Sequence, residues 1–219
     1  MSSNYSVSVV GMGRSGTTLV SEIIEHANGK CGYYHWKKDR GDMSNKKNDN
    51  EYWIICRRDL RDILASGFRS TIQRNRLKEI SGFIVSKDNP LPKGYKKFKV
   101  KEHGSTNFFV KKSEILSHGN QIMYDGWLDW IDKVDYIFHY ERYIENREEV
   151  VEEILSNIGA TNVTAEYCIS VVDEWIKNNP KHASNKGVIN GWGDIFSSKQ
   201  EKLIIDTWGD WMREYNYIK

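Results

Sequence analysis

The chain has 219 residues, and 39% of them are hydrophobic, which is enough for a folded domain with a sizeable core. The net charge is only +2, and no apolar run approaches the length of a membrane span. The composition therefore disfavours a nucleic-acid-binding or membrane-spanning protein, and we expect neither nucleic acid nor a membrane as a partner.

The three cysteines, Cys31, Cys56 and Cys168, are widely spaced and odd in number. They match neither a disulfide framework nor a zinc motif. Cys56 and Cys168 stand among apolar residues and are predicted to be small core residues. A reducing, cytoplasmic location is the expectation that fits this cysteine usage.

The first predicted strand, residues 5–10, leads into a glycine-rich turn, Gly11-Met-Gly-Arg-Ser-Gly16. A helix then runs to about His26, with apolar residues at helical spacing. Glycines let backbone N–H groups turn toward an anion, and the helix N-terminus adds partial positive charge. The spacing is that of G-x-x-x-x-G-K-[ST], but Thr17 stands at the Lys position. We therefore expect a P-loop-like turn that binds a phosphate-like group and does not hydrolyse ATP.

A second anion site is predicted where the buried strand at residues 51–56 runs into Arg58. Asp59 is expected to cap the next helix, with Asp62 completing a capping box. Ser66 lies two turns along this helix, where an Arg fork and a hydroxyl can converge on a phosphate. The alternative that these residues allow is a capped helix with surface Arg residues.

Segment 81–122 is weakly periodic and contains two of the three prolines. Within it, residues 87–112 carry eight Lys against Asp88 and Glu102, a pattern typical of a solvated face or loop. We expect this segment to be a lid or acceptor-binding excursion from a single domain that spans residues 1–219.

The rest of the chain continues the alternation of strands and helices. A Gly-rich loop at residues 185–196 contains Lys186, Gly187 and Trp192. The pattern indicates an α/β fold with a mostly parallel central sheet flanked by helices, in which ligands bind at the carboxyl ends of the strands. Further strands are predicted at residues 30–36 and 134–140, and further helices at 123–131, 148–158, 164–178 and 198–215.

In this order the motifs resemble the sulfotransferase family that uses 3′-phosphoadenosine 5′-phosphosulfate (PAPS). Residues 14–18, RSGTT, match the family's [RK]-S-G-T-T, and residues 58–66 match R-x-P-[RK]-D-x-x-x-S except for Leu60 in place of Pro. The strand ending at Tyr140-Glu141 resembles the family's Y-E-D segment, and residues 185–196 resemble its R-K-G-x-x-G-D-W loop more loosely. The resemblance spans about residues 5–196 and implies an enzyme, a PAPS-dependent sulfotransferase.

The resemblance also implies the roles of individual residues. The 3′-phosphate would be bound by Arg58 and Ser66, helped by Lys186 and Gly187. Arg14 would be catalytic, because it would neutralise charge on the sulfuryl group during transfer. Tyr140 or Trp192 would stack on adenine. The 5′-phosphosulfate would be held by Arg14, Ser15, Gly16, Thr17 and Thr18 through backbone N–H groups and the two Thr hydroxyls.

Sulfuryl transfer is an in-line displacement, so positioning and charge stabilisation dominate and no metal is expected. The acceptor hydroxyl or amine needs a base. The family's K-T-H segment points to His35, although the Lys of that segment is missing. His103, Glu102 and Glu141 stay open as alternatives.

Two other classes of protein fit parts of this pattern. One is a nucleotide kinase or another P-loop nucleotide-binding enzyme, which Thr17 at the Lys position argues against. The other is a non-catalytic module of the same fold that binds an anionic polymer through its Lys-rich stretch. The sequence leaves the oligomeric state open, as well as the choice among a small-molecule, carbohydrate or peptide acceptor.

Overall fold

The structure is a computed structural model, in which the chain forms two compact units. One unit comprises Met1–Arg58 with Ile122–Pro180, and the other comprises Asp59–Gln121 with Lys181–Lys219. The residues described are 6–28, 31–35, 51–73, 84–85, 95–99, 107–111, 133–179, 188–194, 196 and 198–219.

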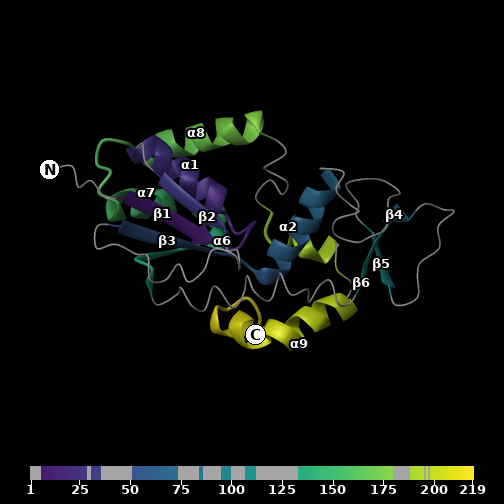
Figure 1. The fold of residues 1–219 in the computed structure, drawn as a ribbon. Helices are drawn as coiled ribbons and strands as arrows, with labels where there is room; N and C mark the ends of the chain where they lie inside the picture. The colour runs from purple at the N-terminus through teal and green to yellow at the C-terminus, as the bar shows by residue number, and fades with distance from the viewer. Residues whose placement is uncertain are drawn as a thin grey trace. The chain divides into compact units, whose positions relative to one another are not determined.

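The first unit is built on a parallel four-stranded sheet in the order β2-β1-β3-β7 (Figure 1). The register pairs Gly11 with His35 on one side and with Cys56 on the other, and it pairs Arg57 with His139. The carboxyl ends of all four strands therefore lie along one edge of the sheet. The strands are β1 (Ser6–Gly11), β2 (Cys31–His35), β3 (Glu51–Arg57) and β7 (Tyr136–His139).

Helices cover one face of this sheet, and the core lies between them and the strands (Figure 1). Alternate strand residues such as Val7, Val9 and Ile54 supply one side of the core, as the two-residue period of a strand requires. Cys56 and Cys168 are fully buried in it, which confirms their predicted place. The helices are α1 (Thr17–Asn28), α6 (Tyr140–Glu145), α7 (Arg147–Asn157) and α8 (Ala165–Asn178).

In its described residues, the second unit contains three helical elements and a small antiparallel sheet. The helical elements are α2 (Leu60–Gln73), the 3-10 turn η5 (Gly191–Asp194) and α9 (Ser198–Glu214). Strands β4 (Ile84–Val85), β5 (Tyr95–Lys99) and β6 (Asn107–Lys111) pair in the order β4-β6-β5. All three strands fall within segment 81–122, which was expected to leave the core as an excursion.

Helix α9 presents a buried apolar face, with Ile204, Trp211 and Met212 inaccessible or nearly so. Trp208 is also buried, and its backbone departs from helical geometry (φ −126°, ψ 16°), so α9 is kinked there. The helix predicted at residues 198–215 is confirmed, and its buried residues recur at helical spacing. The kink was not predicted.

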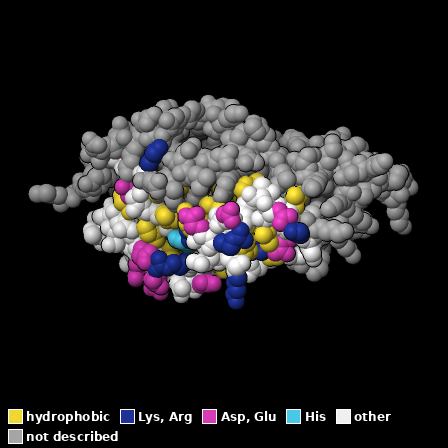
Figure 2. All heavy atoms as spheres, turned by 90° about the horizontal axis from the view of Figure 1, so that it is seen from below, with side chains coloured by type: hydrophobic (Ala, Val, Ile, Leu, Met, Phe, Trp, Pro, Cys, Tyr) yellow, Lys and Arg dark blue, Asp and Glu magenta, His cyan; other side chains and the backbone are white. Residues whose placement is uncertain are grey.

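Every predicted strand and helix that falls on described residues is confirmed to within two residues at each end. The helix predicted at 123–131 lies outside the described residues. Within the described ranges, no helix combines the length and the apolar character that a membrane crossing needs. Figure 2 shows one face of the molecule. In its described part, Lys and Arg side chains are interspersed with Asp and Glu, in keeping with the near-neutral charge of the chain.

Candidate functional site

The glycine loop, residues 11–16, connects β1 to α1 in the first unit and is tightly turned. The hydroxyl of Ser15 donates to the carbonyl of Met12 at 2.7 Å, and the Ser15 N–H donates to the same carbonyl at 3.2 Å. The carbonyl of Gly16 accepts the first helical hydrogen bond, from Val20 N–H at 3.0 Å. Ser15 therefore holds the loop in shape, and the first turn of α1 supplies N–H groups that a helix leaves without an intrahelical acceptor.

Two of the loop glycines stand where a side chain would collide. A Cβ at Gly11 would lie 2.8 Å from Ser15 Oγ, and a Cβ at Gly16 would lie 3.0 Å from the Phe138 ring and 3.1 Å from the Tyr140 ring. Gly16 also has φ +105°, which L-residues rarely adopt. A Cβ at Gly13 would meet nothing within 4 Å. The loop is therefore packed against the sheet at both ends and open at its middle.

Arg14 occupies the loop with a left-handed backbone, φ 76°. Such a conformation is costly for a residue with a Cβ and persists where the surrounding structure imposes it, often at functional sites. The Arg14 side chain is half-buried. The structure thus places a guanidinium-bearing residue, in a strained conformation, between the open middle of the loop and the start of α1.

Arg58 follows the end of β3 and is 3% exposed. Its Nη1 donates to the backbone carbonyl of Arg14 at 3.3 Å. Its guanidinium carbon also lies 4.0 Å from the centroid of the Tyr140 ring, within the range of a cation–π contact. The residue that begins the second predicted anion site is therefore in direct contact with the glycine loop of the first.

A second contact between an Arg and an aromatic ring joins the ends of β3 and β7. Arg57 Nη2 lies 2.6 Å from His139 Nδ1, which must accept because a guanidinium only donates. Burial is the largest cause that lowers the pKa of His139 to about 4, and the positive charges of Arg57 and Arg142 contribute in the same direction. His139 is therefore neutral at pH 7.

Other residues that the sequence predicts for the site also lie in the first unit. Thr17 is the first residue of α1 and is 1% exposed, and Thr18 beside it is half-buried. His35 ends β2, where its backbone pairs with Gly11 beside the loop. Glu141, the alternative base, lies in the first turn of α6 and is half-buried. Lys186, Gly187, His103 and Glu102 lie outside the described residues.

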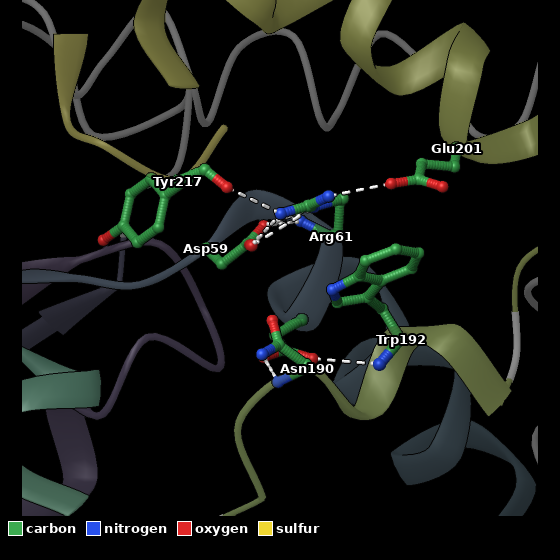
Figure 3. A network of polar contacts seen from close by, with 7 residues as sticks. Asp59, Arg61, Asn190, Trp192, Glu201 and Tyr217 are labelled. Carbon is green, nitrogen blue, oxygen red and sulfur yellow. Dashed lines mark hydrogen bonds and ion pairs between the residues drawn. The ribbon is translucent and has the colours of Figure 1, made fainter. Parts of the chain in front are cut away.

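In the second unit, Ser66 lies on α2 and is 3% exposed. Its convergence with Arg58 on one phosphate stays a prediction. The residues at the start of α2 form a polar network of their own (Figure 3). Asp59 accepts from the Arg61 N–H at 2.8 Å, so Asp59 caps α2 as predicted.

Arg61 is the centre of this network and is buried, whereas the sequence allowed it a surface position. Its guanidinium pairs with Asp59 at 2.7 Å and with Glu201 at 2.8 Å, and it donates to the carbonyl of Tyr217 at 2.9 Å. It also lies 4.3 Å from the centroid of the Trp192 ring. One Arg side chain thus joins α2, η5, α9 and the C-terminal residues.

The Asp62 carboxylate reaches beyond its own helix, and its part in a capping box stays a prediction. The Asp62 carboxylate is fully buried and accepts from the backbone N–H groups of Asn190 at 2.8 Å and Trp192 at 3.0 Å. Asp62 therefore anchors the loop before α9 through two of its backbone N–H donors. Trp192, one of the two residues expected to stack on adenine, packs its ring on Arg61.

Sequence reasoning did not single out Arg57 or His139. Each is the last residue of its strand, and parallel pairing aligns strand ends at one edge, so two polar residues at that position were a usable signal. Among the described residues, no group of three or more His, Cys, Asp and Glu is arranged to hold a metal ion. Models of known protein families and curated protein sequences contain no match to this chain.

Proposed function

We propose that this protein is a PAPS-dependent sulfotransferase. The proposal is carried by one observation: the carbonyl of Arg14 in the glycine loop accepts a hydrogen bond from Arg58 at the end of the adjacent strand. Two cationic residues that the sequence assigned to the two ends of a doubly phosphorylated adenosine are thereby neighbours. The open middle of the loop at Gly13 leaves space for an anion beside them.

The chemistry follows from these residues. The first turn of α1 and the Thr17 and Thr18 hydroxyls hold the 5′-phosphosulfate, and Arg58 holds the 3′-phosphate. The acceptor oxygen forms a bond to sulfur as the bond from sulfur to the 5′-phosphate oxygen breaks. Arg14 neutralises the charge that develops on that leaving oxygen. The acceptor proton passes to a base, for which His35 at the end of β2 is the first candidate.

The products are a sulfated acceptor and adenosine 3′,5′-bisphosphate. Mixed charge in the described part of the surface supports no particular acceptor (Figure 2). Small-molecule, carbohydrate and peptide acceptors with a hydroxyl or an amine all fit the proposed reaction. The proposed binding roles of Ser66, Lys186 and Gly187 rest on the sequence resemblance.

A thermal-shift panel on the full chain tests the class of ligand. Adenosine 3′,5′-bisphosphate without Mg²⁺ should raise the melting temperature, because the site binds both phosphates through side chains and backbone N–H groups. A shift seen only with ATP and Mg²⁺ would contradict the proposal and favour a nucleotide kinase or another P-loop enzyme.

An acceptor screen with radiolabelled PAPS tests the reaction itself, with the Arg14→Ala variant as the blank. Transfer of label by the unaltered chain and not by the blank supports a sulfotransferase. Tight binding of the bisphosphate with no transfer to any acceptor class would favour a non-catalytic anion-binding module.

A further inference from the structure

We infer that Tyr140 is a positioning residue that holds the Arg58 guanidinium against the glycine loop, and that recognition of a 3′-phosphate depends on an aromatic ring at this position. The inference rests on the proposed function and assigns Tyr140 a role other than the predicted stacking on adenine. It starts from the contact between the two side chains, 4.0 Å from the guanidinium carbon to the ring centroid.

The Arg58 guanidinium is held from two directions. The guanidinium carbon lies over the Tyr140 ring, and the Arg14 carbonyl accepts a hydrogen bond from Nη1. A guanidinium carries five N–H donors, so this bond is compatible with further bonds to a phosphate. A planar fork recognises a phosphate well only when its plane is fixed, which is what a ring beside the guanidinium carbon and a carbonyl bonded to Nη1 accomplish.

The Tyr140 ring is itself fixed by the sheet and the loop. Tyr140 begins α6 directly after β7, whose last residue, His139, pairs with Arg57 in the sheet. The ring edge lies 3.1 Å from the point where a Gly16 side chain would begin. The Tyr140 ring thus lies beside Gly16 and under Arg58, and the absence of a side chain at Gly16 makes room for the ring. Through this ring, the position of the glycine loop helps to fix the position of the guanidinium.

This packing also argues against the stacking of adenine on the same ring. One face of Tyr140 is in contact with Arg58, which an adenine would have to displace or avoid. If the ring served adenine, its loss would weaken every adenosine nucleotide equally. If it serves Arg58, its loss would weaken only nucleotides that carry a 3′-phosphate. The two roles are therefore separable by comparing two ligands.

The experiment measures the Kd of adenosine 3′,5′-bisphosphate and of adenosine 5′-monophosphate by calorimetry on the full chain. The ratio of the Kd of the monophosphate to the Kd of the bisphosphate reports recognition of the 3′-phosphate. In Tyr140→Leu this ratio should fall about tenfold, because a desolvated cation–π contact is lost. Tyr140→Phe keeps the ring and should keep the ratio. In the Arg58→Ala background, Tyr140→Leu should have no further effect on the ratio.

Tyr143→Leu is the matched control, since Tyr143 lies on the same helix and has its own cation–π contact, with Arg147 at 5.3 Å. It should lower stability and leave the ratio unchanged. If Tyr140→Leu does not fold, Tyr140→Met serves in its place with the same expected ratio.

The outcomes separate the inference from the proposed function. If the unaltered chain binds the two nucleotides equally well, the proposed function fails and the inference fails with it. If the unaltered chain prefers the bisphosphate and Tyr140→Leu keeps that preference, the inference alone is overturned. Equal weakening of both nucleotides by Tyr140→Leu would also overturn it and restore adenine stacking.

Discussion

Arg14 combines a strained backbone with a charged side chain at the middle of the glycine loop. Its φ of 76° lies in a region that costs roughly 1–2 kcal/mol for a residue with a Cβ. Strain of this kind persists where the fold over-determines the conformation, and it clusters at functional positions. Under the proposed function, catalysis requires the Arg14 side chain while stability would favour glycine at this position.

Replacing Arg14 by glycine should lower turnover without lowering stability. Turnover in Arg14→Gly should fall about 100-fold or more, because the charge that neutralises the leaving oxygen is lost. The free energy of unfolding should stay level or rise by about 1 kcal/mol, because glycine adopts a positive φ without a steric cost. Steady-state kinetics and urea unfolding measure the two effects. Arg14→Lys is the control for charge, and a Gly variant with turnover within about tenfold of the original would exclude the catalytic role.

Gly16 and Gly13 form a matched pair within the same loop. Gly16→Ala should cost about 1–3 kcal/mol of stability, because its Cβ would press on the Phe138 and Tyr140 rings at φ +105°. Gly13→Ala meets nothing within 4 Å and should change stability by no more than a few tenths of a kcal/mol. Chemical denaturation of both variants tests this. Equal destabilisation by the two substitutions would contradict the described packing of the loop.

His139 predicts a pH dependence of stability. Its folded-state pKa of about 4 lies below the ordinary value of 6.5, so the unfolded chain binds the proton more readily. Stability should therefore be unaffected by this group above pH 6.5 and should fall as the pH is lowered from 6.5 toward 4. For this half-buried side chain the loss should reach about 2 kcal/mol.

The control for this prediction is His139→Gln, which keeps an acceptor for Arg57 and does not titrate in this range. The unfolding free energy of the unaltered chain minus that of His139→Gln should narrow or change sign as the pH drops from 7.5 to 5. Parallel pH profiles of the two proteins would show that His139 is not the titrating group.

At the scale of elements, buried charges in the second unit fasten loops and termini to helix α2. Arg61 and Asp62 leave the same turn of α2 and bind different segments, the first α9 and Tyr217, the second the loop at Asn190 and Trp192. A buried carboxylate that accepts two backbone N–H groups is costly to replace, because the donors would stay buried without an acceptor. These polar contacts hold the segments of the second unit together, in addition to its buried apolar residues.

Asp62→Asn therefore should destabilise the protein by about 2–3 kcal/mol, since an amide offers only one acceptor oxygen to two donors. Asp206→Asn is the control, because the exposed Asp206 pairs only at the surface of α9 with Lys202, at 2.9 Å. That pair is worth a few tenths of a kcal/mol. Thermal unfolding measures both, and a loss below about 0.5 kcal/mol for Asp62→Asn would contradict an anchoring role.

At the scale of the whole molecule, the ligand should act on a defined part of the chain. The glycine loop, the end of β3 and the start of α6 all belong to the first unit. Adenosine 3′,5′-bisphosphate at a hundred times its Kd should stabilise the binding-competent fold by about 2.7 kcal/mol. For a chain of this size that corresponds to a rise in melting temperature of about 5–10 °C.

Hydrogen exchange can locate this stabilisation. Protection on binding should appear at residues 11–20, at Arg58 and at residues 138–141, because these segments carry the proposed contacts. The same measurement on Arg58→Ala should show protection of the loop without the 3′-phosphate contribution. Protection confined to segment 81–122 would contradict a site at the carboxyl ends of the parallel strands.

The sequence by itself determined the strands of the parallel sheet, most of the helices and the α/β class of this protein. Hydrophobic spacing set the bounds of β1, α1, α8 and α9, because burial of a face depends on local periodicity. The strand order pointed to an anion site at Arg58, and the family resemblance paired Arg58 with Arg14. Parallel strands joined through helices align their carboxyl ends, so a shared edge followed from the order of elements alone.

Only the tertiary structure decided which side chains meet. The Arg58–Tyr140 contact, the Arg57–His139 bond and the anchoring of Asn190 by Asp62 join residues far apart in the chain. Local patterns cannot choose such partners, because each Arg or Asp has several candidates of equal chemistry. Partner choice is fixed by strand register and close packing, which exist only once the chain has folded.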